Sequence, residues 1–128
     1  MTGCWEIVVD HLDRPTTTNK AHQMHHRAVS ADRKKWREAG QVLARAAKIP
    51  KLDAAKIVCW GRYPDRRSLP DADAVAPALK GVLDGIVDAG VLPDDNGTYV
   101  HEIAYRPPVV EKGALPALVV QVHQVIMP

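Results

Sequence analysis

Four aspartates flank one predicted amphipathic helix in the middle of the chain. Asp71 and Asp73 precede this helix, and Asp94 and Asp95 follow it. If the helix folds back on a sheet, its two flanking loops could meet, and Asp71, Asp73 and Asp95 would then converge on one point. Carboxylate oxygens are the ligands that hard divalent cations prefer. The spacing therefore indicates a candidate metal site.

Basic side chains border these acids. Lys80 lies on the helix itself, and Arg66 and Arg67 stand shortly before the acid pair. An ammonium group near the acids could neutralise the charge that develops on a phosphate or a leaving oxygen. A carboxylate cluster bordered by arginines indicates a metal-dependent enzyme whose substrate is polyanionic.

Each of these residues also has a simpler interpretation. Asp71 and Asp73 could be helix N-terminal charges that the macrodipole favours. Lys80 could be an ordinary exposed lysine that pairs with Asp84 on the same helix face. The sequence 94–97, Asp-Asp-Asn-Gly, is typical of a plain turn. Only the combination of acids before and after the helix favours the metal site.

The composition suits one domain over residues 1–128, because the chain has 128 residues of which 46% are hydrophobic. The formal net charge is only +2, so the class of partner has to be inferred from where the charges lie. Between residues 14 and 37 the only acid is Asp32, and the basic residues are Arg14, Lys20, Arg27, Arg33, Lys34, Lys35 and Arg37. Lys20 and Arg27 are candidate phosphate contacts. The later charges could equally form a solvated helix face.

The cysteines and histidines do not indicate a zinc site. Cys4 and Cys59 lie far apart and form no CxxC pair. His22, His25 and His26 lack a cysteine or acid at the usual zinc spacing, which favours a solvated loop. No signal peptide and no bilayer-spanning run is evident, so we expect a protein of the reducing cytoplasm without a membrane partner.

The hydrophobic pattern predicts an α+β domain with the element order β-α-β-α-β-β. Strands are expected at 5–9, 56–63, 98–106 and 118–126, and helices at 31–47 and from Pro77 to a cap at Gly90. Ser30 is the expected N-cap of the first helix, and residues 10–29 are expected to form a long loop. We expect a mixed four-stranded sheet with two helices packed on one face, the second helix crossing over between strands.

The aromatic residues Trp36 and Trp60 are expected to anchor the core. Trp60 or Tyr63 could alternatively wedge against exposed bases of a branched nucleic acid.

These features together resemble the RusA family of Holliday junction resolvases, which is common in phages and prophages. The central matching segments are Pro64-Asp65-Arg66-Arg67, Asp71-Ala72-Asp73, Lys80-Gly81-Val82-Leu83-Asp84-Gly85 and Asp88-Ala89-Gly90-Val91-Leu92-Pro93-Asp94-Asp95. The resemblance extends to residues 15–19, which follow the first strand, and to Lys112-Gly113 with the final strand. It therefore covers most of the chain, and it implies a RusA-like fold.

The resemblance implies a crossover junction endodeoxyribonuclease, a hydrolase that resolves Holliday junctions or other branched DNA in recombination, repair or phage DNA processing. It implies that Asp71, Asp73 and Asp95 bind Mg²⁺ or Mn²⁺ and that Lys80 assists catalysis. It also implies a homodimer acting on a four-way junction in the cytoplasm of a bacterial host. The side chains expected to hold the DNA backbone are Lys20, Arg27, Arg66 and Arg67.

Two features differ from the family's pattern. Ala74 stands where the family usually has asparagine, and Ala74-Val75-Ala76 lengthens the spacing from Asp73 to Lys80 by about one helical turn. These differences motivate an alternative, a RusA-like protein that binds DNA or a host protein without cutting DNA. A further alternative is a structural or host-interaction protein that uses only the dimer surface.

Overall fold

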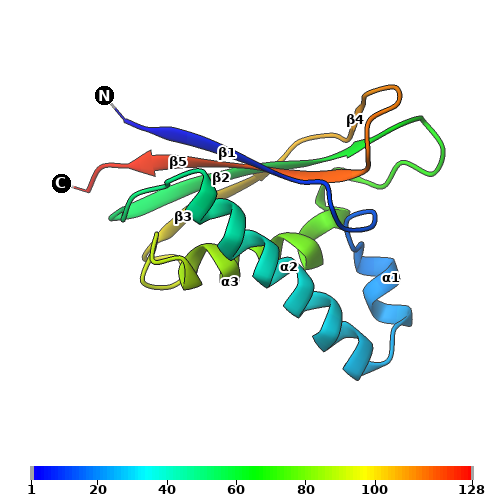
Figure 1. Ribbon diagram of the computed structural model, residues 1–128, viewed down its shortest axis with the longest axis horizontal. Helices are drawn as coiled ribbons and strands as arrows, with labels where there is room; N and C mark the ends of the chain where they lie inside the picture. The colour runs from blue at the N-terminus through cyan, green and yellow to red at the C-terminus, as the bar shows by residue number, and fades with distance from the viewer. Residues whose placement is uncertain (1, 128) are drawn as a thin grey trace.

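The computed structural model describes residues 2–127, and it shows a mixed sheet with its two longer helices on one face (Figure 1). The strand order is β1-β5-β2-β3, and the short β4 also pairs with β2. β1 (Cys4–Val9) and β2 (Ala54–Tyr63) run antiparallel to β5 (Ala117–Val125), whereas β3 (Val100–Tyr105) and β4 (Val109–Val110) run parallel to β2. The predicted α+β class is confirmed. The described part of the chain has five strands, one more than expected, because Val109 and Val110 add β4 beyond the prolines that end β3.

α3 (Ala76–Asp88) is the crossover between the parallel strands β2 and β3, as the sequence predicts. A 3₁₀ turn, η1 (Ala72–Val75), leads into it. Pro77 lies in the first turn, where its missing N–H costs no hydrogen bond. After the helix, Gly90 has φ +85°, a left-handed conformation that glycine adopts without steric cost. Both predicted boundaries of this helix therefore lie close to the observed ones.

The prediction of a long loop over residues 10–29 is wrong. This stretch contains α1 (Thr18–Gln23), and α2 (His26–Ala46) begins before Ser30. The N-cap of α2 is His25, whose Nδ1 accepts a hydrogen bond from the Arg27 N–H at 3.2 Å. α1 buries no residue, and in α2 the buried positions begin only at Trp36. Without a buried face the sequence has no apolar periodicity to reveal these turns.

Three glycines set the distance between α2 and α3. A Cβ atom at Gly40 would lie 2.5 Å from the Val82 carbonyl oxygen, and one at Gly81 would lie 2.6 Å from the Trp36 Cβ. A Cβ atom at Gly85 would collide with the backbone carbonyl of Arg37. The two helices therefore approach closely enough for backbone to pack against backbone.

The core lies between the helices and the sheet. The helical residues predicted to face inward are buried, among them Leu79, Val82, Leu83 and Ile86. They pack against buried strand residues that include Ile57, Cys59, Leu118, Val120 and Val122. Within residues 2–127, no helix combines the length and apolarity needed to span a membrane.

Candidate functional site

The acid pair lies where the chain leaves the loop after β2 and enters η1. Asp71 is the residue before η1, has an extended backbone and makes no side-chain capping hydrogen bond. Asp73 lies in the first turn, and both side chains are exposed. The Asp71 carboxylate is therefore not used to cap the turn, although the helix-end interpretation still applies to Asp73.

A groove of about 590 Å³ runs beside this acid pair. One wall is formed by residues 17–19, and the other by the segment 68–74, which includes Asp71 and Asp73. The walls are joined where the Thr18 hydroxyl donates to the Ala74 carbonyl at 3.5 Å. Residues 17–19, in the segment that follows the first strand, thus face the candidate acids.

A buried hydrogen-bond network fixes the base of this groove wall. Thr16 is only 3% exposed. Its hydroxyl donates to the Asp32 carboxylate at 2.5 Å and accepts from the Trp36 Nε1–H at 3.1 Å. Sequence reasoning missed this network because Thr16 is distant in the chain from Asp32 and Trp36, and the three residues belong to no motif.

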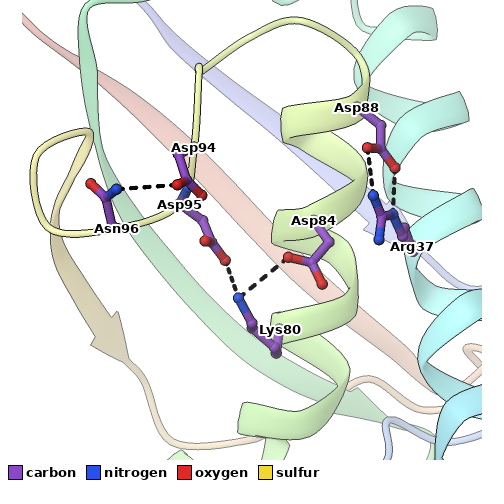
Figure 2. Close-up of polar contacts among 7 residues, drawn as sticks. All are labelled: Arg37, Lys80, Asp84, Asp88, Asp94, Asp95 and Asn96. Atoms are coloured by element: carbon purple, nitrogen blue, oxygen red, sulfur yellow. Dashed lines mark hydrogen bonds and ion pairs between the residues drawn. The ribbon is translucent and has the colours of Figure 1, made fainter.

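Lys80 lies between two acids on one side of α3 (Figure 2). Its ammonium group donates a hydrogen bond to the Asp95 carboxylate, and it lies 3.3 Å from the Asp84 Oδ1. The hydrogen bond to Asp95 is the main reason that the Lys80 pKa is raised, and the same bond lowers the pKa of Asp95. The interpretation of Asp84 as a helix-face partner of Lys80 is confirmed.

Asp94 shapes the loop that carries Asp95. Its carboxylate accepts hydrogen bonds from the Asp95 backbone N–H at 2.7 Å and from the Asn96 Nδ2 at 3.2 Å. The Asn96 side chain in turn accepts from the Thr98 N–H at 3.0 Å. The turn interpretation of this segment therefore holds for Asp94, whose two oxygens are both used inside the loop (Figure 2).

The structure does not gather Asp71, Asp73 and Asp95 into one cluster. Over residues 2–127, no three His, Cys, Asp or Glu side chains lie close enough to hold a metal ion together. Asp73 stands seven positions before Lys80, with residues 74–76 taken up by the end of η1 and the start of α3. Asp95 instead contacts Lys80, one turn inside α3.

The donor set nevertheless has the right chemistry for Mg²⁺ or Mn²⁺. All three candidate ligands offer carboxylate oxygens, and Asp71 and Asp73 are exposed. Asp95 would have to exchange or share its contact with Lys80 in order to join them.

The four cationic side chains expected to hold DNA are all exposed: Lys20, Arg27, Arg66 and Arg67. None of them forms an ion pair with any residue in the described range 2–127. Lys20 directly follows Asn19 of the groove wall, and its backbone N–H donates to the Thr17 hydroxyl. The Arg67 backbone N–H donates to the Asp65 carboxylate at 2.8 Å, which forms a tight turn before the acid pair.

The structure bears on the interpretations of the aromatic and histidine residues. Tyr63 is 1% exposed, so the alternative in which its ring wedges against bases is wrong. Trp60 is half-buried, with the Arg106 guanidinium 5.4 Å from its ring centroid. The three clustered histidines are exposed: His22 lies on α1, His25 is the N-cap of α2 in the short link between the two helices, and His26 is the first residue of α2.

No model of a known protein family matches the chain, and no curated protein matches it either.

Proposed function

We propose that this protein is a metal-dependent endonuclease that acts on branched DNA such as four-way junctions. The observation that carries the proposal is the groove in which Asp71 and Asp73 face residues 17–19. Exposed Lys20, Arg66 and Arg67 lie on the segments that form its two walls or continue from them. The cations can offset the repulsion between the acids and a phosphate backbone. The RusA-like sequence pattern supports the reaction class.

Asp71, Asp73 and Asp95 are the residues that would hold Mg²⁺ or Mn²⁺, which supplies Lewis-acid polarisation of a phosphate and an activated water when bound. Lys80 is positively charged at neutral pH, as an ordinary lysine is, and its hydrogen bond to Asp95 raises its pKa further. A fixed positive charge at that place stabilises negative charge that develops on a phosphate. Arg66 and Arg67 would orient the strand through its phosphates.

A homodimer in the cytoplasm of a bacterial host is part of this proposal. A four-way junction presents its four strands in equivalent pairs, and a two-fold symmetric dimer would place one acid groove at each member of a pair. A phage or prophage origin would agree with the family that the sequence resembles.

A second candidate function is DNA binding without cleavage. It is favoured by the pairing of Asp95 with Lys80 and by the lack of a three-acid cluster in the described residues. Ala74, where the family usually has asparagine, agrees with it. The groove and its cations are the same under both proposals.

Cleavage and binding of a labelled four-way junction separate the candidates. Nicking is measured in Mg²⁺ and in Mn²⁺, and affinity is measured by gel shift in chelator. The proposed enzyme cuts the junction, and Asp71→Asn abolishes cutting. Asp53→Asn is the matched control because it removes an exposed carboxylate outside the groove.

The outcomes of this experiment are distinct. A wild-type protein that binds the junction in chelator but never nicks it selects the second candidate. A wild-type protein that does not bind branched DNA at low salt overturns both.

A further inference from the structure

The N-terminal half of α2 is ordered without a buried side chain. The first buried residue of this 21-residue helix is Trp36, so none of the residues 26–35 is buried. With a rise of 1.5 Å per residue, this part extends about 15 Å. Together with α1 it forms a helical hairpin, residues 18–35, that projects away from the sheet at one end of the molecule (Figure 1). Helices that bury so little gain little stability from packing, which suggests that the surface itself is used.

The hairpin is nevertheless fixed to the rest of the domain. At its base, Thr16 bridges Asp32 of the hairpin and Trp36 of the core. Between the two helices, Met24 and Val29 line a cavity of about 130 Å³ together with Pro77 of α3. The hairpin is therefore a preformed surface.

The positive charge of the chain is concentrated on this hairpin. Its charged residues are Lys20, Arg27, Arg33, Lys34 and Lys35 against the single acid Asp32, a net charge of +4. The whole chain has 17 basic and 15 acidic residues, so the remainder has 12 and 14, a net charge of −2. Among the described residues, Lys20, Arg27 and Arg33 make no ion pair. These three cations are available for a polyanion.

The hairpin is continuous with the acid groove, since α1 begins at Thr18 and both Thr18 and Asn19 line that groove. We propose that the helical hairpin is a second DNA-contacting surface, which holds the phosphate backbone of the duplex arm adjacent to the groove. This inference rests on the proposed function, and it specifies the surface on which a duplex arm of the junction lies. The part of α2 before Trp36, about 15 Å long, would lie alongside about nine phosphate charges of a duplex, counted over both strands. DNA is favoured as the partner because the surface is cationic and leads into the groove.

Salt-dependent binding in chelator tests the inference without any need for cleavage. The double variant Arg27→Gln/Arg33→Gln removes two exposed hairpin cations. The matched control, Arg45→Gln/Lys51→Gln, removes two exposed cations at or beyond the opposite end of α2. The slope of log K against log salt is negative, and each lost phosphate contact reduces its magnitude by about 0.9. The magnitude should therefore be smaller by about 2 in the hairpin variant, on a four-way junction and on linear duplex, while the control stays close to wild type.

Two results would overturn the hairpin inference alone. One is a hairpin variant with the wild-type slope and affinity, and the other is an equal loss in both double variants, which would reflect net charge and not a surface. In both cases the wild type still binds and the proposed function stands. A wild type that binds no branched DNA contradicts the proposed function itself, and the inference falls with it. Circular dichroism of both variants establishes that the helices remain folded.

Discussion

The Lys80 ammonium donates a hydrogen bond to the Asp95 carboxylate and joins α3 to the loop that follows it (Figure 2). This contact lowers the pKa of Asp95, so its stabilising effect is present at neutral pH and is lost as the pH falls through that lowered pKa. Lys80 has a raised pKa, so its own contribution is lost only as the pH rises through that value, in the alkaline range.

Asp95→Asn should therefore lower the free energy of unfolding at neutral pH by less than about 1 kcal/mol, because the Lys80 side chain is 48% exposed and water screens the pair. Urea denaturation across the acidic range measures the effect. The difference from wild type should shrink toward zero once Asp95 of the wild type is protonated. A difference that grows as the pH falls would contradict the assigned ion pair.

The close approach of α2 and α3 makes Gly85 intolerant of a side chain. Gly85→Ala places a Cβ against the Arg37 carbonyl, and overpacking of this kind costs about 1–3 kcal/mol. Gly97→Ala is the control, since a Cβ there has no neighbour within 4 Å, and surface substitutions change stability by about 0.5 kcal/mol or less. Thermal unfolding of the two variants measures the contrast. Equal stability of the two would rule out the helix contact.

Thr16 should be required for the geometry of the groove. Thr16→Val keeps the shape but leaves the Trp36 Nε1–H and the Asp32 carboxylate without their shared partner, at a cost of about 1–3 kcal/mol. Amide hydrogen exchange of Lys20 and Ala21, whose N–H groups donate to the neighbouring Thr17, should then become faster, and Thr16→Ser should restore protection. If valine and serine behave alike, the hydroxyl does not hold the groove wall.

Arg67 should contribute to DNA affinity and not to stability. Its side chain is exposed and makes no ion pair among residues 2–127. Arg67→Ala should weaken junction binding and lower the slope of its salt dependence by about 1, as expected for one lost phosphate contact. Gel-shift titration at several salt concentrations reports both values. An unchanged slope would remove Arg67 from the DNA surface.

Elements with a buried face could be predicted from the sequence. The helical spacing of Leu79, Val82 and Ile86 predicted which face of α3 packs against the core, and all three side chains are buried. α1 and the start of α2 could not be predicted, because they bury no side chain and are held by one hydroxyl network and a few apolar contacts. The requirement for glycine at position 85 could not be predicted from the sequence either, since it arises from a backbone atom of another helix.

The candidate site shows the same division. Sequence spacing predicted the pairing of Lys80 with Asp84, because both lie on one helix face. It also suggested that Asp71, Asp73 and Asp95 converge, but that arrangement depends on how far the loop after α3 returns along the helix. No spacing rule encodes that distance, and the loop returns as far as Lys80.

The most direct test of the proposed function is junction cleavage by wild type and Asp73→Asn in Mg²⁺, with affinity measured in chelator. Asparagine keeps the size of the side chain but removes a ligand charge, so the cation is held less well and cleavage is lost. Removal of a negative charge beside the phosphate path lessens repulsion, so affinity for the junction stays equal or increases. We predict a wild type that cuts the four-way junction and an Asp73→Asn protein that binds it without cutting. An Asp73→Asn protein that cuts at the wild-type rate would contradict the proposed site.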